Sequence, residues 1–218
     1  MEHLEHDIWI VGYGRFGRLA LDRLGQARQK SRFLVIDPAA QKESSPRGRA
    51  RFVQEDGVLF LTRRLGAESS AEWIVPAVPL HLAAEWFLAG AGPDYAQRIA
   101  VPAEIKDYAP NLMAGGSGDN YTSLATCQCP DDCPEPASYC SVTQEKREQN
   151  LFDLLQAIDI AGYQIQVLRS HQLAPGVGGY KARDLLSLQK DLLQNPGRHI
   201  VATACRCHGV ITALECYA

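Results

Sequence analysis

The stretch that decides the fold is IWIVGYGRFG, residues 8–17. Its four apolar residues predict a buried strand from Asp7 to Val11, and a helix is expected from Arg15 to about Leu24. Between the two, the glycines stand in the order G-x-G-x-x-G. A second apolar run from Arg32 to Ile36 predicts another strand, which ends at Asp37. The order strand, glycine turn, helix, strand and acid therefore predicts one supersecondary unit.

Each element of this unit has a physical role in holding a dinucleotide. Gly12 allows the tight turn, Gly14 lets the backbone approach a pyrophosphate, and Gly17 lets the helix pack closely on the strand. The helix N-terminus offers free N–H groups and a positive dipole end to the phosphates. Asp37 accepts hydrogen bonds from both ribose hydroxyls and repels the 2′-phosphate of NADP. The region from about Asp7 to about Pro102 is therefore predicted to be a Rossmann-type domain that binds NAD(H).

Two further residues are assigned to this cofactor site. Arg15 opens the helix and is positioned to contact phosphate, although a solvated arginine explains it equally well. The segment WIVPAVP, residues 73–79, carries two prolines at the carboxyl end of a predicted strand. Ligands of doubly wound sheets bind at that end, so Pro76 is predicted to line the nicotinamide side of the cleft. The alternative is that these prolines only terminate the strand.

At these residues the sequence resembles the dinucleotide-binding domains of the Trk-type potassium-uptake regulators and related Rossmann dehydrogenases. The resemblance covers roughly the first 100 residues, and its specific part is Val11 to Gly17 together with Asp37. It implies NAD(H) binding through these glycines and the acid. The polar connection from Pro38 to Arg49 departs from the pattern, because no helix is expected there.

Alternating strand and helix patterns along the chain predict an α/β fold. We expect a Rossmann-like parallel sheet in residues 1–102 and a smaller cysteine-rich α/β region in residues 103–218, joined by a glycine-rich loop. The remaining predicted strands are 50–54, 73–78, 99–101, 164–168 and 199–204, and the remaining helices are 57–65, 81–88, 146–161 and 182–193.

Seven cysteines are clustered in the second half of the chain. Four of them spell C-x-C-x3-C-x6-C with prolines between them, and these four are Cys127, Cys129, Cys133 and Cys140. Thiolates are soft ligands, so the cluster predicts an iron–sulfur cluster or zinc, with free redox-active thiols as the third interpretation. The spacing matches neither the usual zinc pairs nor the usual iron–sulfur loops.

A second group of cysteines lies near the C-terminus. Cys207 is assigned to the metal site, where it and His208 would complete the first group or bind separately. The alternative is that His208 is an ordinary loop histidine that binds no metal. Cys205 and Cys216 are interpreted as small buried hydrophobic residues.

The segment from Ser170 to Lys181 is predicted to be a glycine-containing loop. Within it His171 and Lys181 are candidates for acid–base or substrate-binding roles, although a structural loop explains them better. Together with His81 they discriminate between two functions. An enzyme requires at least one of the three near the nicotinamide position, whereas a sensor requires none.

Composition limits the partners. The chain has 218 residues, 46% hydrophobic and 22% charged, and a formal net charge of -3. This balance gives no reason to expect nucleic acid as a partner, and no apolar run approaches the roughly 20 residues that span a bilayer. The polar N-terminus, Met1 to His6, does not match a secretory leader, and clustered free thiols favour the cytoplasm. A homo-oligomer is compatible with the sequence.

These observations lead to three hypotheses. The first is an NAD(H)-binding redox protein, such as a dehydrogenase, with a cysteine-ligated metal or iron–sulfur centre. Because a hydride carries two electrons and an iron–sulfur cluster takes one, direct transfer between the two sites is disfavoured. The second is an NAD(H)-sensing regulatory module that acts on a protein partner without catalysis. In the third, zinc simply stabilises a small C-terminal domain. The sequence identifies neither a substrate nor a partner.

Overall fold

The protein is described from a computed structural model, and the structure describes residues 7–40 and 48–218. The N-terminal stretch Met1 to His6, and residues 41–47 of the polar connection after Asp37, lie outside the described residues. Within the described part, no helix is long and apolar enough to cross a membrane.

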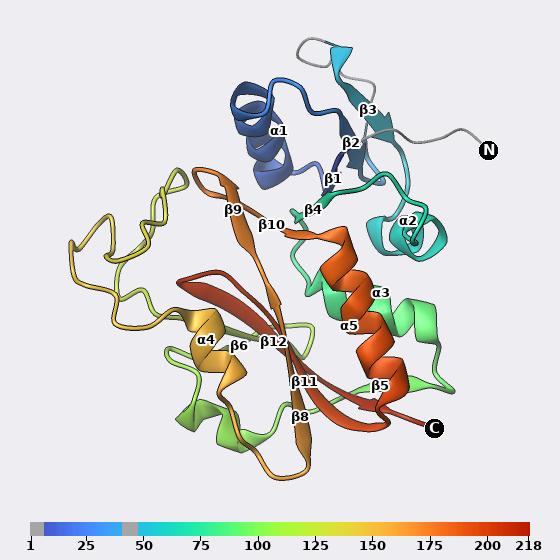
Figure 1. Cartoon of the computed structure of the whole chain (residues 1–218), viewed down its shortest axis with the longest axis vertical. Coiled ribbons are helices and arrows are strands. Elements are labelled where there is room, and N and C mark those ends of the chain that lie inside the picture. The colour runs from blue at the N-terminus through green and yellow to red at the C-terminus, as the bar shows by residue number, and fades with distance from the viewer. Residues whose placement is uncertain (1–6, 41–47) are drawn as a thin grey trace.

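The first sheet begins with four parallel strands in the order β3-β2-β1-β4 (Figure 1). Their bounds are β1 Ile8–Val11, β2 Phe33–Ile36, β3 Ala50–Val53 and β4 Trp73–Pro76. All residues of β1 and β2 are buried, because both faces of the sheet are covered by helices. Ile8 and Ile10 pack toward α1 (Arg15–Ala27), whereas Trp9 and Val11 pack toward α2 (Gly57–Arg64) and α3 (Leu82–Ala91).

A hairpin extends this sheet past β4. Its strands are β9 (His171–Ala174) and β10 (Val177–Lys181), and β10 runs antiparallel to β4. The prediction of a loop from Ser170 to Lys181 was therefore wrong. Only Pro175 and Gly176 lie between the two strands, and the positive φ of 68° at Gly176 makes the tight connection.

The second sheet is built mainly by the C-terminal half. Its strand order is β6-β7-β12-β11-β8, and β5 pairs with the remaining length of β12. β8 and β11 are parallel, and the other pairs are antiparallel. The bounds are β5 Ala96–Ile99, β6 Met113–Ala114, β7 Asn120–Ser123, β8 Tyr163–Arg169, β11 Gly197–Ala204 and β12 His208–Cys216.

One hydrophobic core joins the two sheets. Helix α5 (Ala182–Gln194) lies with α2 and α3 on one side of the molecule (Figure 1). Leu185 of α5, Val201 of β11 and Leu214 of β12 belong to the same buried cluster as Trp9 and Ile74. A separate cluster lies under α4 (Leu151–Gln156) and the 3-10 helix Ala103–Asp107.

The fold is thus mixed α/β with two mixed six-stranded sheets. The strand expected at 99–101 begins earlier, at Ala96, and joins the second sheet, and the helix expected at 146–161 is confined to Leu151–Gln156. The region 103–218 also contributes β9 and β10 to the first sheet. The two halves therefore exchange strands across the predicted linker.

Candidate functional site

The glycine turn after β1 is closely packed on one side and open on the other. A Cβ at Gly12, whose φ is +99°, would lie 2.5 Å from the carbonyl oxygen of Ala77. A Cβ at Gly17 would lie 2.0 Å from the carbonyl oxygen of Gly12, so only glycine lets α1 pack there. Gly14 has no neighbouring atom within 4 Å of its added Cβ. The turn therefore leaves free space beside the helix N-cap.

The N-terminus of α1 carries no competing anion of its own. Gly14 is its N-cap, no side chain caps it, and the first turn has no acidic residue. The N–H groups there remain available to an external anion.

Asp37 lies at the carboxyl end of β2 and faces this turn. Its Oδ2 accepts the backbone N–H of Tyr13 at 2.7 Å, and its Oδ1 accepts that of Ala39 at 2.7 Å. Each carboxylate oxygen keeps a second lone pair for a hydroxyl group. Pro76 ends β4 directly beside Val11, at the same edge of the sheet. The structure thus brings Gly12, Gly14, Asp37 and Pro76 to one edge.

Arg15 contacts a loop that is far away in sequence. Its side chain is 74% exposed and forms an ion pair with Asp131, in the middle of the cysteine-rich segment. The next residue, Phe16, is 57% exposed and lines a pocket shared with the cysteines. The first turn of α1 therefore faces the cysteine-rich loop.

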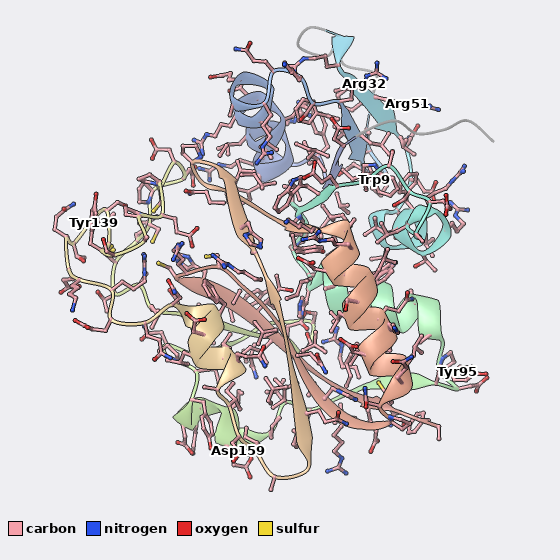
Figure 2. All side chains as sticks on the ribbon, in the orientation of Figure 1. Trp9, Arg32, Arg51, Tyr95, Tyr139 and Asp159 are labelled. Atoms are coloured by element: carbon pink, nitrogen blue, oxygen red, sulfur yellow. The ribbon has the colours of Figure 1, made fainter. Side chains whose placement is uncertain are left out.

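That loop, residues 124–150, is fastened to the β9–β10 hairpin and to α1. Arg23 donates to the carbonyl oxygens of Asp131 and Pro175. The backbone N–H of Gly176 donates to the carbonyl oxygen of Cys133 at 3.0 Å, and Gln172 donates to the same oxygen at 2.7 Å. Figure 2 shows Tyr139 on the outer part of this loop, far from the molecule's centre. Because β10 is antiparallel to β4, the hairpin turn brings the loop to the carboxyl edge of the parallel strands.

The two cysteine groups meet in space. β11 and β12 are joined by the tight turn Cys205 to His208, closed by the N–H of Cys205 donating to the carbonyl oxygen of His208. The loop bonds to this turn, since the Leu124 N–H donates to the carbonyl oxygen of Cys207 and the Arg206 N–H donates to the carboxylate Oε1 of Glu135. As a result the Cys129 Sγ lies 3.6 Å from the His208 Nε2.

Several sulfur atoms accept hydrogen bonds. Cys205 Sγ accepts the N–H groups of Cys207 and His208, each at 3.4 Å, and Cys133 Sγ accepts that of Glu135 at 3.4 Å. Cys207 Sγ accepts an N–H of Arg147 at 3.0 Å. Such donors stabilise a thiolate and tune a metal that it binds.

The pKa values of the thiols diverge with their surroundings. Burial raises the pKa of Cys129 to about 11, with a further contribution from the thiols of Cys127, Cys133 and Cys207 nearby. Burial, assisted by Glu135, raises the pKa of Cys205 to about 12. In contrast, the backbone N–H of Thr143 lowers the pKa of Cys140 to about 7. Burial, together with neighbouring negative groups, thus opposes the ionisation of Cys129 and Cys205 unless a cation binds there.

A pocket of about 800 Å³ separates α1 from the two cysteine groups. Its walls come from five parts of the chain: Phe16 of α1, the cysteine-rich loop, Leu154 of α4, the β9–β10 hairpin with the preceding Ser170, and the turn after β11. Five cysteines line it, namely Cys129, Cys133, Cys140, Cys205 and Cys207.

The predicted metal ligands are therefore largely gathered, with two corrections. Cys205, interpreted as a core residue, is only partly buried and lines the pocket, whereas Cys216 is buried as predicted. Arg147, which also lines the pocket, donates to the sulfur of Cys207. The sequence did not predict this contact, because the segment around Arg147 has the pattern of a helix. Over residues 7–40 and 48–218, no three His, Cys, Asp or Glu side chains already converge as ligands of one ion.

The three acid–base candidates lie elsewhere. His81 is 1% exposed, and its ring nitrogens lie 2.7 Å from Thr212 Oγ1 and 2.8 Å from Thr203 Oγ1. The ring of His171 packs against Trp73, and Lys181 Nζ lies 5.5 Å from the centre of the same indole. Trp73 begins β4, so these two side chains are at the opposite end of that strand from Pro76.

Comparisons with known proteins give a family without an assigned activity. A family model described as "Uncharacterized protein, C-terminal domain" matches residues 71–217. A protein of Archaeoglobus fulgidus, described as "Uncharacterized protein", is 32% identical over 178 residues, which are 76% of this chain and 74% of that protein. No solved structure matches the chain.

Proposed function

The chain belongs to that family, and from the geometry of its site we propose that it is an NAD(H)-binding sensor with a cysteine-ligated metal or iron–sulfur centre. The observation that carries the proposal of NAD(H) binding is the position of Asp37. Its carboxylate accepts the N–H of Tyr13 inside the G-x-G-x-x-G turn, beside the open space at Gly14. This is where a ribose and a pyrophosphate would lie in a Rossmann-like unit.

Several features support a Rossmann-like interpretation. The strand order β3-β2-β1-β4 is that of the first four strands of a Rossmann-type doubly wound sheet. The turn after β1 fits a dinucleotide, because Gly12 and Gly17 are packed too closely for a side chain, whereas Gly14 leaves open space. The bound cofactor would be either NAD or NADH, and the protein would respond to which of the two is bound. The resemblance to the Trk-type potassium-uptake regulators points to the same regulatory use.

Sensing is favoured over hydride transfer by the positions of the acid–base candidates. His81 has both ring nitrogens occupied by threonine hydroxyls, and His171 and Lys181 pack on Trp73. None of the three faces the edge where Pro76 and Gly12 meet. A sensor transmits its state through contacts, and the ion pair between Arg15 and Asp131 links the cofactor edge to the cysteine-rich loop. Free thiols in this number fit a reducing compartment such as the cytoplasm.

A titration with NADH tests the dinucleotide proposal. Wild-type protein should bind NADH more tightly than NADPH, and Asp37→Ala should weaken NADH binding about tenfold or more and reduce that preference. Asp22→Ala is the matched control, because it removes an exposed carboxylate of α1 that bonds only Gln26 among the described hydrogen bonds. Absence of NADH binding by wild type, or equal binding by Asp37→Ala, would contradict the proposal.

The pocket favours a second candidate, an NAD-dependent dehydrogenase. A volume of about 800 Å³ between Phe16 and the cysteines is large enough for a small-molecule substrate. A dehydrogenase must bind such a molecule together with NADH. Native mass spectrometry of the NADH complex distinguishes the two, since a retained small molecule favours the enzyme and its absence favours the sensor.

A further inference from the structure

The structure suggests which side chains form the cysteine-ligated centre, and they are not those of the single run C-x-C-x3-C-x6-C. We propose that one soft metal centre is held by two short-spaced pairs on separate loops, Cys129 with Cys133 and Cys205 with His208. This inference rests on the cysteine-ligated centre of the proposed function and defines its ligands.

The spacing of these residues fits the proposal better than the continuous run does. Metal sites in proteins commonly use two pairs separated by a long stretch, with two to four residues between the members of a pair. Cys129 and Cys133 have three residues between them, and Cys205 and His208 have two. The turn that joins β11 to β12 brings His208 of the second pair to Cys129 of the first.

The distance across the pairs has the value that a shared metal requires. Bonds of about 2.3 Å to sulfur and about 2.0–2.1 Å to nitrogen, at the tetrahedral angle, set an S to N separation of about 3.6 Å. The Cys129 Sγ and the His208 Nε2 lie 3.6 Å apart. One edge of a tetrahedral site thus has the required length, and the proposal assigns the other two ligand positions to Cys133 and Cys205.

Backbone donors mark the remaining two ligands. The turn Cys205 to His208 directs two N–H groups, those of Cys207 and His208, at the Cys205 sulfur. Cys133 Sγ accepts the N–H of Glu135 in the same way. Hydrogen bonds of this kind hold a ligating sulfur in orientation and balance its charge.

The other cysteines differ in spacing or burial. Only one residue separates Cys207 from Cys205, fewer than the two to four within a pair, and Cys207 Sγ accepts an N–H of the Arg147 guanidinium at 3.0 Å. Cys216 is 4% exposed within the core that joins the sheets. Cys127 does not line the pocket, and six residues separate Cys140 from Cys133, more than within a pair. These four are therefore left outside the proposed ligand set.

Three thiolates and one imidazole suit zinc, and they also suit an iron–sulfur cluster with one histidine ligand. The shared chemistry is soft thiolate and imidazole ligation. The visible spectrum separates the two, since a cluster absorbs broadly near 400 nm and zinc does not.

The test is metal analysis of full-length protein purified anaerobically. Wild type should carry about one equivalent of zinc or one cluster. Cys205→Ser and His208→Ala should lose at least about four fifths of it, whereas Cys127→Ser and the core control Cys216→Ser should retain it. His208→Cys supplies a fourth thiolate and should restore the metal, which a merely structural role of His208 would not produce.

The outcomes separate this inference from the function on which it rests. Full metal content in Cys205→Ser and His208→Ala, with loss in Cys127→Ser, would overturn the two-pair assignment and leave a cysteine centre in place. A metal-free wild type that still binds NADH would overturn both the assignment and the centre, and leave the dinucleotide proposal intact. If Cys205→Ser fails to fold by circular dichroism, the His208→Ala and His208→Cys pair decides.

Discussion

The guanidinium of Arg15, the first residue of α1, forms an ion pair with the carboxylate of Asp131 in the cysteine-rich loop. The two residues are 116 positions apart in the chain, and the contact joins the cofactor edge to the proposed metal loop. Arg15 is thereby held away from the anion that the helix N-terminus is expected to bind. Loop position and dinucleotide affinity are therefore expected to depend on each other.

Releasing Arg15 should strengthen dinucleotide binding. Asp131→Asn removes the competing carboxylate, so Arg15 becomes available to the pyrophosphate and NADH should bind up to about fivefold tighter, the range of an exposed ion pair. Isothermal titration at low and high salt measures it, and the gain should shrink at high salt. Asp132→Asn is the matched control, because it removes the same charge at the next residue. An equal gain in both variants would mean that general charge, and not the Arg15 contact, sets the affinity.

Two glycines of the same turn should behave in opposite ways. Gly14→Ala adds a methyl group into open space, so thermal stability should stay near the wild-type value while NADH binding falls at least about tenfold, because the backbone no longer approaches the pyrophosphate. Gly17→Ala places its methyl 2.0 Å from the Gly12 carbonyl oxygen and should lower the free energy of unfolding by about 1–3 kcal/mol. Thermal melts and NADH titrations of both variants check this. A stable Gly14→Ala protein with undiminished NADH affinity would contradict the proposal that the pyrophosphate binds beside Gly14.

His81 has a defined protonation state. Thr212 donates its only hydroxyl hydrogen to the Asp119 carboxylate at 2.5 Å, so it must accept from His81 Nδ1–H. The Nε2 then carries no proton and accepts from Thr203. Burial lowers the pKa of His81 to about 4, while Asp119 opposes the shift and Arg98 adds to it. The folded protein therefore keeps this imidazole neutral.

Stability should fall as the pH drops through the window from about 6.5 to about 4. In that range the unfolded chain binds a proton at His81 and the folded chain does not, so the free energy of unfolding rises with pH. Between pH 7.5 and pH 5 the loss from this group is about 2 kcal/mol. Urea unfolding of wild type and His81→Gln at both pH values measures it. The difference between the two pH values should be smaller in the variant, and equal pH dependence in both proteins would show that other groups cause it.

Local sequence patterns predicted the first half of the fold well. The apolar runs of β1 and β2 and the glycines between them carry strong local signals, and both strands and α1 lie where the sequence indicates them. The hairpin β9–β10 was missed because its strands contain Gly178 and Gly179, which weaken a strand pattern. The helix expected from Lys146 begins only at Leu151, because Arg147 and Asn150 before it form hydrogen bonds with the turn after β11.

The candidate site was predictable in part for a different reason. The glycines of the turn after β1 and the acid Asp37 belong to a motif of residues close together in sequence, so the sequence predicts them directly. Cys129 and His208 are 79 positions apart in sequence, and their meeting depends on the turn between β11 and β12. β12 itself was not predicted, so the sequence did not indicate that Cys205 lies in a turn between two strands. A contact between residues so far apart leaves no signal in residue spacing.

Gly176 should control the cysteine-rich loop without being a ligand. Its φ is +68°, and an added Cβ would lie 1.6 Å from the carbonyl oxygen of Asp131. Gly176→Ala should therefore push the loop away, break the bond from Gly176 N–H to Cys133, and lower metal content at least about twofold. Gly162→Ala is the matched control, because its φ of +81° imposes the same backbone strain while nothing lies within 4 Å of its Cβ. Thermal melts should show a similar cost for the positive φ in both variants, about 1 kcal/mol. Metal loss in Gly176→Ala alone would show that seating of the loop on the hairpin assembles the ligands, whereas equal metal content in the two variants would show that the ligands assemble independently of it.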